Sequence, residues 1–126
     1  MEALSERFEK RIDEIVARYP DYHCDIYRHT FRALENAGRR VSDAAVRSIS
    51  VTDFVKGDVV SLAVKEWGIL AFSVFCFWGV ATGADLKNVL QRLVRFKVFK
   101  QDVGERLEQL NAIDLKEIFI EWLKNR

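Results

Sequence analysis

The residues with the clearest potential for chemistry gather near the start of a predicted helix. Imidazole, thiol and carboxylate groups, all of which can bind a transition metal ion, come from His23, Cys24, Asp25 and His29. Their spacing is unfavourable, because neighbours on a helix such as His23 and Cys24 point about 100° apart, and residues share a face only at separations of three or four. His29 lies six positions beyond His23. The pattern predicts a capped, partly exposed helix start with no metal site.

The second cysteine and the paired carboxylates favour structural roles. Cys76 stands in the most apolar stretch of the chain, where a thiolate is disfavoured, so we expect an inert core thiol. Two cysteines make neither a disulfide framework nor a zinc pattern, and both are expected to be reduced. Neighbouring acids, such as Asp13 with Glu14 or Glu105 with Glu108, are typical of solvated faces. The sequence thus predicts no catalytic residue, no cofactor and no small-molecule substrate.

A local basic surface is the candidate for nucleic-acid binding. It covers the outer face of the predicted helix 84–96 and the residues just after it, at Lys87, Arg92, Arg95, Lys97 and Lys100. A helix, a turn rich in glycine, an amphipathic helix and a hairpin would follow the order of a winged helix-turn-helix, whose second helix enters the major groove. Asp85, however, stands at the N-terminal end of that helix and would repel phosphate. Nucleic-acid binding is therefore the alternative hypothesis.

Binding to another protein is the favoured hypothesis, mainly because no reactive cluster stands out. Tyr22 and Tyr27 are its candidate residues, since a partly exposed tyrosine gives a rigid anchor for a partner. The net charge of +1 argues against a chain-wide electrostatic grip on nucleic acid. The chain opens with a charged amphipathic segment and has no secretory signal there, which favours a cytoplasmic protein. We therefore expect a non-enzymatic interaction or adaptor module.

The elements that position these residues are predicted to be helices of one domain, residues 1–126. Hydrophobic residues make up 49% of the chain, enough for a single core at this length. Apolar residues at helical spacing run from Leu4 to Tyr19, and Pro20 should end that helix. Gly38 should end the second helix, and Asp85 should complete a capping box with Thr82. Helices are expected to follow caps at Asp21, Thr52, Thr82 and Asp114.

The central helix is expected within the uncharged run at residues 67–81. Residues 69–78 are apolar on every side, which is typical of a helix that its neighbours cover all round. The run is shorter than the roughly 18 to 20 apolar residues of a membrane span, and Gly68 and Gly79 interrupt its ends. We therefore predict a buried core helix and no membrane association.

Two segments are compatible with more than one structure. Residues 39–51 hold β-branched residues whose spacing fits neither helix nor strand, so a short helix and an extended edge both stay open. Residues 98–112 fit a loop, a short hairpin or a weak helix. The predicted fold is mainly α, a single compact domain of five to six helices around a central apolar helix at about 69–78, with a short hairpin or irregular element near 98–112.

Several motifs resemble those of a small protein family described as restricted to Verrucomicrobia and Planctomycetes. The motifs are residues 19–27, 63–68 and 85–94, with Trp78, Gly79 and Val80 as a tryptophan-glycine turn between them. The resemblance covers most of residues 8–119 and implies a small bacterial protein, without assigning any catalytic residue. This chain departs from the family pattern at Cys24, where the family tends to be basic, and after Phe99, where its acidic character is weaker. A partner surface shared with the family is therefore not implied.

Overall fold

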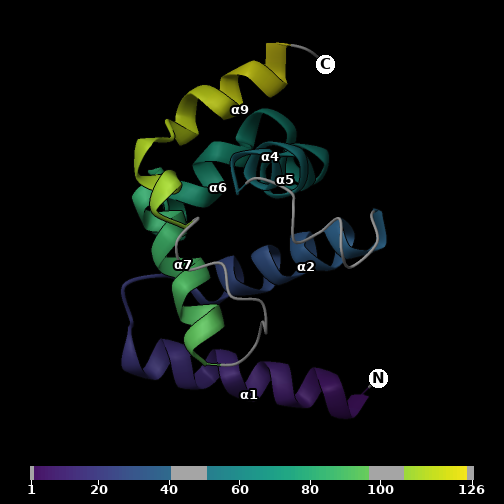
Figure 1. Ribbon diagram of the computed structural model, residues 1–126, viewed down its shortest axis with the longest axis vertical. Helices are drawn as coiled ribbons and strands as arrows, with labels where there is room; N and C mark the ends of the chain where they lie inside the picture. Colours follow the sequence, from purple (N-terminus) through teal and green to yellow (C-terminus); the bar gives the residue numbers. More distant parts are fainter. Residues whose placement is uncertain (1, 41–50, 97–106, 125–126) are drawn as a thin grey trace.

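The computed structural model describes residues 2–40, 51–96 and 107–124, and every element within them is helical. In chain order the elements are α1 (Glu2–Arg18), α2 (Cys24–Arg40), α4 (Val51–Phe54), η1 (Val55–Val60), α5 (Ser61–Trp67), η2 (Gly68–Leu70), α6 (Ala71–Phe77), α7 (Gly83–Arg95), η3 (Glu108–Ala112) and α9 (Leu115–Lys124). Of these, η1 is a π-helix, whereas η2 and η3 are 3-10 helices. The prediction of a mainly α fold around a central apolar helix is confirmed (Figure 1).

Parts of the two ambiguous segments lie outside the described residues. The structure does not describe residues 41–50 and 97–106. The predicted extended edge and hairpin, and the basic residues Lys97 and Lys100, therefore fall outside the described residues. The described end of the second segment is helical, because η3 forms there and buries Leu110. Of the alternatives for that segment, the weak helix is the one that its described residues adopt.

Helix ends follow the predicted signals in most places. α1 ends at Arg18, two residues before Pro20, and the capping box of Thr82 and Asp85 starts α7. The carboxylate of Asp114 accepts the backbone N–H of Glu117 at 3.2 Å, as expected of a cap for α9. Three boundaries were predicted wrongly. α2 begins at Cys24, so Asp21 is not its cap, and it continues past Gly38 to Arg40. The helix that was predicted to follow a cap at Thr52 has already begun at Val51.

A continuous helical run of 26 apolar-rich residues, Thr52–Phe77, forms the centre of the fold. It is much longer than the predicted core helix 69–78, because α4, η1 and α5 lead directly into η2 and α6. The run turns at Gly68, whose φ of 55° is unfavourable for residues with a side chain. In Figure 1, α4 and α5 are seen nearly end-on, whereas α6 runs across the picture.

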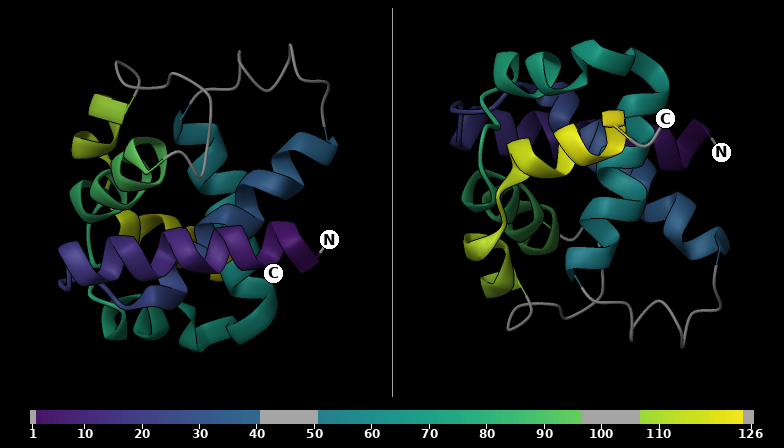
Figure 2. Two further views of the ribbon diagram at one scale, coloured as in Figure 1. Left: turned by 90° about the horizontal axis from the view of Figure 1, so that it is seen from below. Right: turned by 90° about the horizontal axis from the view of Figure 1, so that it is seen from above.

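By length and composition this run could cross a membrane. Its most apolar 18-residue window has a mean hydropathy of 1.7, and 39% of that window is buried within the protein. The shorter run used for the prediction missed this, because it stopped at the charged pair Lys65 and Glu66. The run changes direction at Gly68, so its two parts point different ways (Figure 2).

The first part of the run packs between α2 and α9. Val55, Val59 and Val60 are fully buried there. Two carbonyl groups of η1 accept hydrogen bonds from side chains, that of Lys56 from the Trp122 indole N–H at 2.7 Å and that of Val59 from His29 at 3.0 Å. These contacts tie η1 to a helix on each side.

The second part, α6, contributes an aromatic cluster on one side only. The Phe75 ring is fully buried, with its centroid 5.1 Å from that of Phe119 and 5.7 Å from that of Trp78. The expectation that neighbours cover residues 69–78 all round is wrong, because Ile69, Leu70 and Phe77 are 79%, 62% and 78% exposed. Within the described residues, α6 packs mainly on α5 and α9, so its other side stays open.

Candidate functional site

Two turns meet beside the start of α2. The His23 backbone N–H donates to the carbonyl of Trp78 at 3.0 Å, which joins the α1–α2 turn to the end of α6. Gly79, with φ of 95°, permits the contact, because a Cβ atom there would lie 2.9 Å from the Asp21 carbonyl oxygen. Between the turns is an open groove of about 450 Å³, lined by Val16, Pro20, Asp21, Tyr22, His23, Cys24, Phe77, Trp78 and Gly79.

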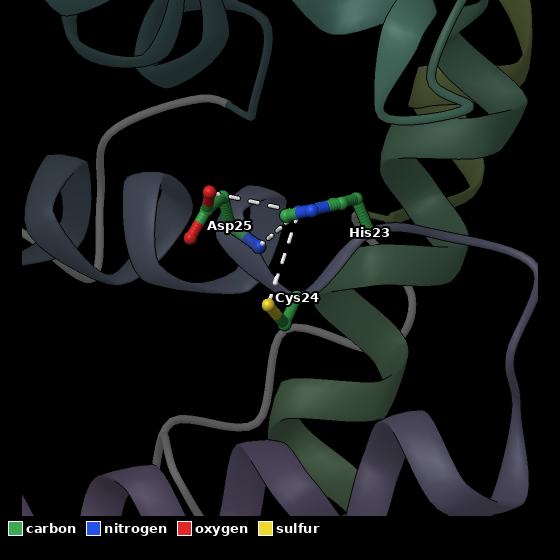
Figure 3. A group of neighbouring side chains, drawn as sticks. All are labelled: His23, Cys24 and Asp25. Carbon is green, nitrogen blue, oxygen red and sulfur yellow. Dashed lines mark hydrogen bonds and ion pairs between the residues drawn. The ribbon is translucent and has the colours of Figure 1, made fainter.

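Three side chains with metal-ligand chemistry converge at the edge of this groove. Figure 3 shows the ring of His23 directed between the carboxylate of Asp25 and the sulfur of Cys24. The Nδ1 atom of His23 lies 3.8 Å from the Cys24 sulfur and 3.6 Å from Asp25 Oδ2. The three ligand atoms all lie within 4.8 Å of one another.

The prediction that this spacing keeps the groups apart is wrong. It assumed that His23 lies on a helix, whereas α2 begins only at Cys24. His23 therefore occupies the cap position, and its Nδ1 atom accepts the backbone N–H of Asp25 at 3.1 Å. That hydrogen bond folds the ring back over the first turn of α2, where the thiol and the carboxylate lie.

Arg28 orients two members of this cluster. Its Nη1 atom donates to Asp25 Oδ1 at 2.6 Å and to the Cys24 sulfur at 3.1 Å. The other edge of the guanidinium donates to both carboxylate oxygens of Glu9 on α1, at 2.7 to 3.0 Å. The hydrogen bond from Arg28 holds the pKa of Glu9 below its usual value. The cluster is therefore anchored to α1 through one arginine.

His29 does not join this group. It is buried, whereas a partly exposed helix start was predicted for this group of residues, and it packs beside the rings of Trp67, Phe75 and Trp78. A carbonyl oxygen can only accept a hydrogen bond, so the 3.0 Å contact between His29 Nε2 and the Val59 carbonyl oxygen requires the proton on Nε2. The Nδ1 atom is buried without a hydrogen-bond partner. Burial lowers the pKa of His29, which favours the neutral ring.

The predicted basic surface of α7 is largely engaged within the protein. Arg92, with its side chain only 15% exposed, forms a two-pronged ion pair with Asp21 at 2.7 and 3.0 Å. Lys87 lies 3.0 Å from Glu108, and Arg95 donates to the Tyr19 hydroxyl at 2.9 Å. The expectation of an outward basic face is therefore wrong for Arg92 and Lys87, because acids far away in the sequence fold onto them.

Tyr22 and Tyr27 are buried, so the expectation of partly exposed anchors is also wrong. The Tyr22 hydroxyl donates to Asp85 at 2.9 Å and accepts from Asn88 at 3.1 Å. Burial, reinforced by the neighbouring Asp85 carboxylate, raises the pKa of Tyr22 to about 12. The Tyr27 hydroxyl accepts a hydrogen bond from Arg92 at 3.1 Å. Both tyrosines belong to the network that attaches α7 to the α1–α2 turn.

An exposed apolar surface lies on η2 and α6, at residues predicted to be core. We call it the α6 face, formed by Ile69, Leu70 and Phe77, with exposed Ser73 and Cys76 between them. Cys76 is exposed, so its predicted core position is wrong. The prediction assumed that neighbouring helices cover α6 on every side. No residue is charged from position 67 to 84, so the α6 face carries no charge of its own. The sequence gives little signal for this exposure, because the same absence of charge is typical of a buried helix.

No family model matches the chain, and no curated protein or solved structure matches it. The resemblance of its motifs to the Verrucomicrobia and Planctomycetes family therefore stays a prediction.

Proposed function

We propose that this chain is a non-enzymatic interaction module that binds a partner protein through the α6 face. One observation carries the proposal. Three large apolar side chains, two in η2 and one at the end of α6, are 62% to 79% exposed. An exposed apolar surface is a usual mark of an interaction site where its residues form one patch.

The spacing indicates how the partner binds. Leu70, Ser73 and Phe77 stand three and four positions apart, so they follow one line from the end of η2 along α6. Apolar anchors at this spacing characterise a helix that lies in the groove of another protein. We infer that the partner supplies an uncharged apolar groove and that Leu70 and Phe77 fill it.

The chemistry of α7 favours this function over nucleic-acid binding. Arg92 and Lys87, which were expected to contact phosphate, have acidic partners within the chain, and Arg95 contacts a tyrosine. Binding a phosphate would require breaking the Arg92–Asp21 pair first. The charge-free α6 face needs no such rearrangement before it binds.

Crosslinking from the α6 face tests the proposal. In a Cys24→Ser background, Cys76 is the only thiol of the chain and can carry a photoactivatable crosslinker in cells of the native host. The matched control carries the same reagent at Glu14→Cys, an exposed position of α1, in a chain that also has Cys76→Ser. We expect one partner protein to be crosslinked from position 76, at residues lining an apolar groove, and not from position 14. Phe77→Ser should remove that product.

Three results would overturn the proposal. Crosslinking of Cys76 only to a second copy of the chain would indicate self-association. Flotation of the purified chain with phosphatidylcholine vesicles, lost in Phe77→Ser, would indicate that the α6 face binds lipid. Equal crosslinking from positions 76 and 14 would mean that the α6 face has no preference for a partner.

A further inference from the structure

We propose that His23, Cys24 and Asp25 form a binding site for a divalent transition metal ion of the zinc class. The proposal does not rest on the function assigned to the α6 face. Nitrogen, sulfur and oxygen ligands together suit Zn²⁺, which accepts imidazole, thiolate and carboxylate in one tetrahedral shell. Three protein ligands leave the fourth position for water.

The distances between the ligand atoms fit such an ion. With bonds of about 2.0 to 2.3 Å, the corners of a tetrahedron lie roughly 3.3 to 3.8 Å apart. His23 Nδ1 is 3.6 Å from Asp25 Oδ2 and 3.8 Å from the Cys24 sulfur. Since all three atoms lie within 4.8 Å, small side-chain rotations complete the triangle.

The cluster is accessible and remains anchored. The side chains of His23 and Asp25 are 41% and 48% exposed, so an ion reaches them from solvent without opening the core. Arg28 holds Asp25 through Oδ1, which leaves Oδ2 facing the imidazole. The same guanidinium donates to the sulfur of Cys24. Hydrogen bonds of this kind orient metal ligands and support a bound thiolate.

Charge is balanced in the complex. Arg28 is positive and would repel a cation by itself, but Glu9 already pairs with it. The two positive charges of the ion are then matched by Asp25 and by the thiolate that Cys24 becomes on binding. Because the thiol proton is released to solvent, binding should strengthen as pH rises. Binding also exchanges the hydrogen bond between His23 Nδ1 and the Asp25 N–H for a coordination bond.

Zinc and cobalt binding by the full-length reduced chain tests the site. Titration calorimetry with Zn²⁺ should show one ion per chain, and Co²⁺ should give a thiolate-to-cobalt charge-transfer band in the near ultraviolet. Cys24→Ser should abolish the band and weaken Zn²⁺ binding at least about 100-fold, since loss of merely supporting residues already weakens metal sites 10- to 100-fold. His23→Asn keeps a residue that caps helices well and should also weaken binding.

The matched control is Cys76→Ser, which removes the other thiol and should bind as the unsubstituted chain does. Circular dichroism of each variant checks that α2 is intact. Absence of a one-to-one complex with the folded, reduced chain would overturn the proposal. So would equal binding by Cys24→Ser and the unsubstituted chain, or an equal loss in Cys76→Ser.

Discussion

The helices α6 and α7, which flank one turn, meet their surroundings in opposite ways. α7 carries polar side chains on its outer side, and most of those described have partners within the protein, as with Arg92 and Asp21. α6 carries apolar side chains, and some of them have little cover from the described elements, as at Phe77, which is 78% exposed. The sequence predicted an interaction surface on α7, but most of its described polar side chains bind partners within the protein. It predicted a core helix at α6, but part of α6 is exposed to solvent.

The difference follows from what each kind of group gains from a neighbour. A charged side chain with low exposure must be paired, so Asp21, Tyr22 and Tyr27 gather around the polar side of α7. An exposed apolar side chain gains mainly by removal from water, which a second molecule can provide. The candidate interaction surface is therefore where apolar groups lack a neighbour, rather than where charges are most frequent.

The largest expected effect comes from the buried side of α6. Phe75→Ala removes a fully buried ring that contacts His29, Trp78 and Phe119. We expect the free energy of unfolding to fall by about 4 kcal/mol, because the lost burial and the cavity add together. Urea denaturation followed by tryptophan fluorescence measures this. If Phe75→Ala does not fold, Phe75→Leu should fold with a smaller loss, and no loss in either variant would contradict the packing of α6.

The next effect is expected on the paired side of α7. Arg92→Met keeps an apolar stem but removes the hydrogen bonds to Asp21 and to the buried Tyr27 hydroxyl. We expect a loss of about 2 kcal/mol in unfolding free energy, moderated because Asp21 is half exposed and becomes hydrated. Arg95→Met is the matched control, since Arg95 is exposed and should change stability by less than about 0.5 kcal/mol. Equal effects at both positions would remove the proposed distinction between the largely buried Arg92 and the exposed Arg95.

A smaller effect is expected where the buried side of α6 meets α2. Burial lowers the pKa of His29 from its ordinary value of 6.5. As pH falls, the ring therefore takes up a proton in the unfolded chain at a higher pH than in the folded chain. Unfolding free energy should therefore fall as pH drops below about 6.5, by up to about 1.4 kcal/mol per pH unit. Glu9 and Asp21, whose pKa values are lowered by arginines, lose their contribution only below about pH 4.5.

His29→Gln isolates the histidine contribution to that pH dependence. Its amide can still donate to the Val59 carbonyl but does not titrate. Between pH 6.5 and 5, the unsubstituted chain should lose about 1 kcal/mol more than this variant in urea denaturation. An unchanged slope in His29→Gln would show that another group is responsible.

Local signals in the sequence were enough to predict most of the helices. Pro20, the Thr82 and Asp85 pair and Asp114 act within a few positions of the helix ends that they determine. Such short-range rules transfer well from sequence to structure, because neither partner depends on the rest of the fold.

The candidate sites depend on contacts that local signals do not contain. Arg92 meets Asp21 across 71 positions, so helical periodicity could place it on the outer face but could not supply its partner. The histidine cap at His23 lies outside the usual choice of serine, threonine, aspartate and asparagine, and its effect on Cys24 was missed with it. In α6 an uncharged run with Ser73 as its one hydroxyl residue does not indicate which side is covered.

The smallest expected change in stability is also the sharpest test of the comparison. Phe77 lies two residues after Phe75 on the same helix, but its side chain is 78% exposed. Phe77→Ala should therefore alter the unfolding free energy by less than about 0.5 kcal/mol in urea, against about 4 for Phe75→Ala. Under the proposed function it should still weaken partner binding more than tenfold, because the ring is an anchor. Stability lost together with binding would instead assign Phe77 to the core, and intact binding would move the interaction surface away from α6.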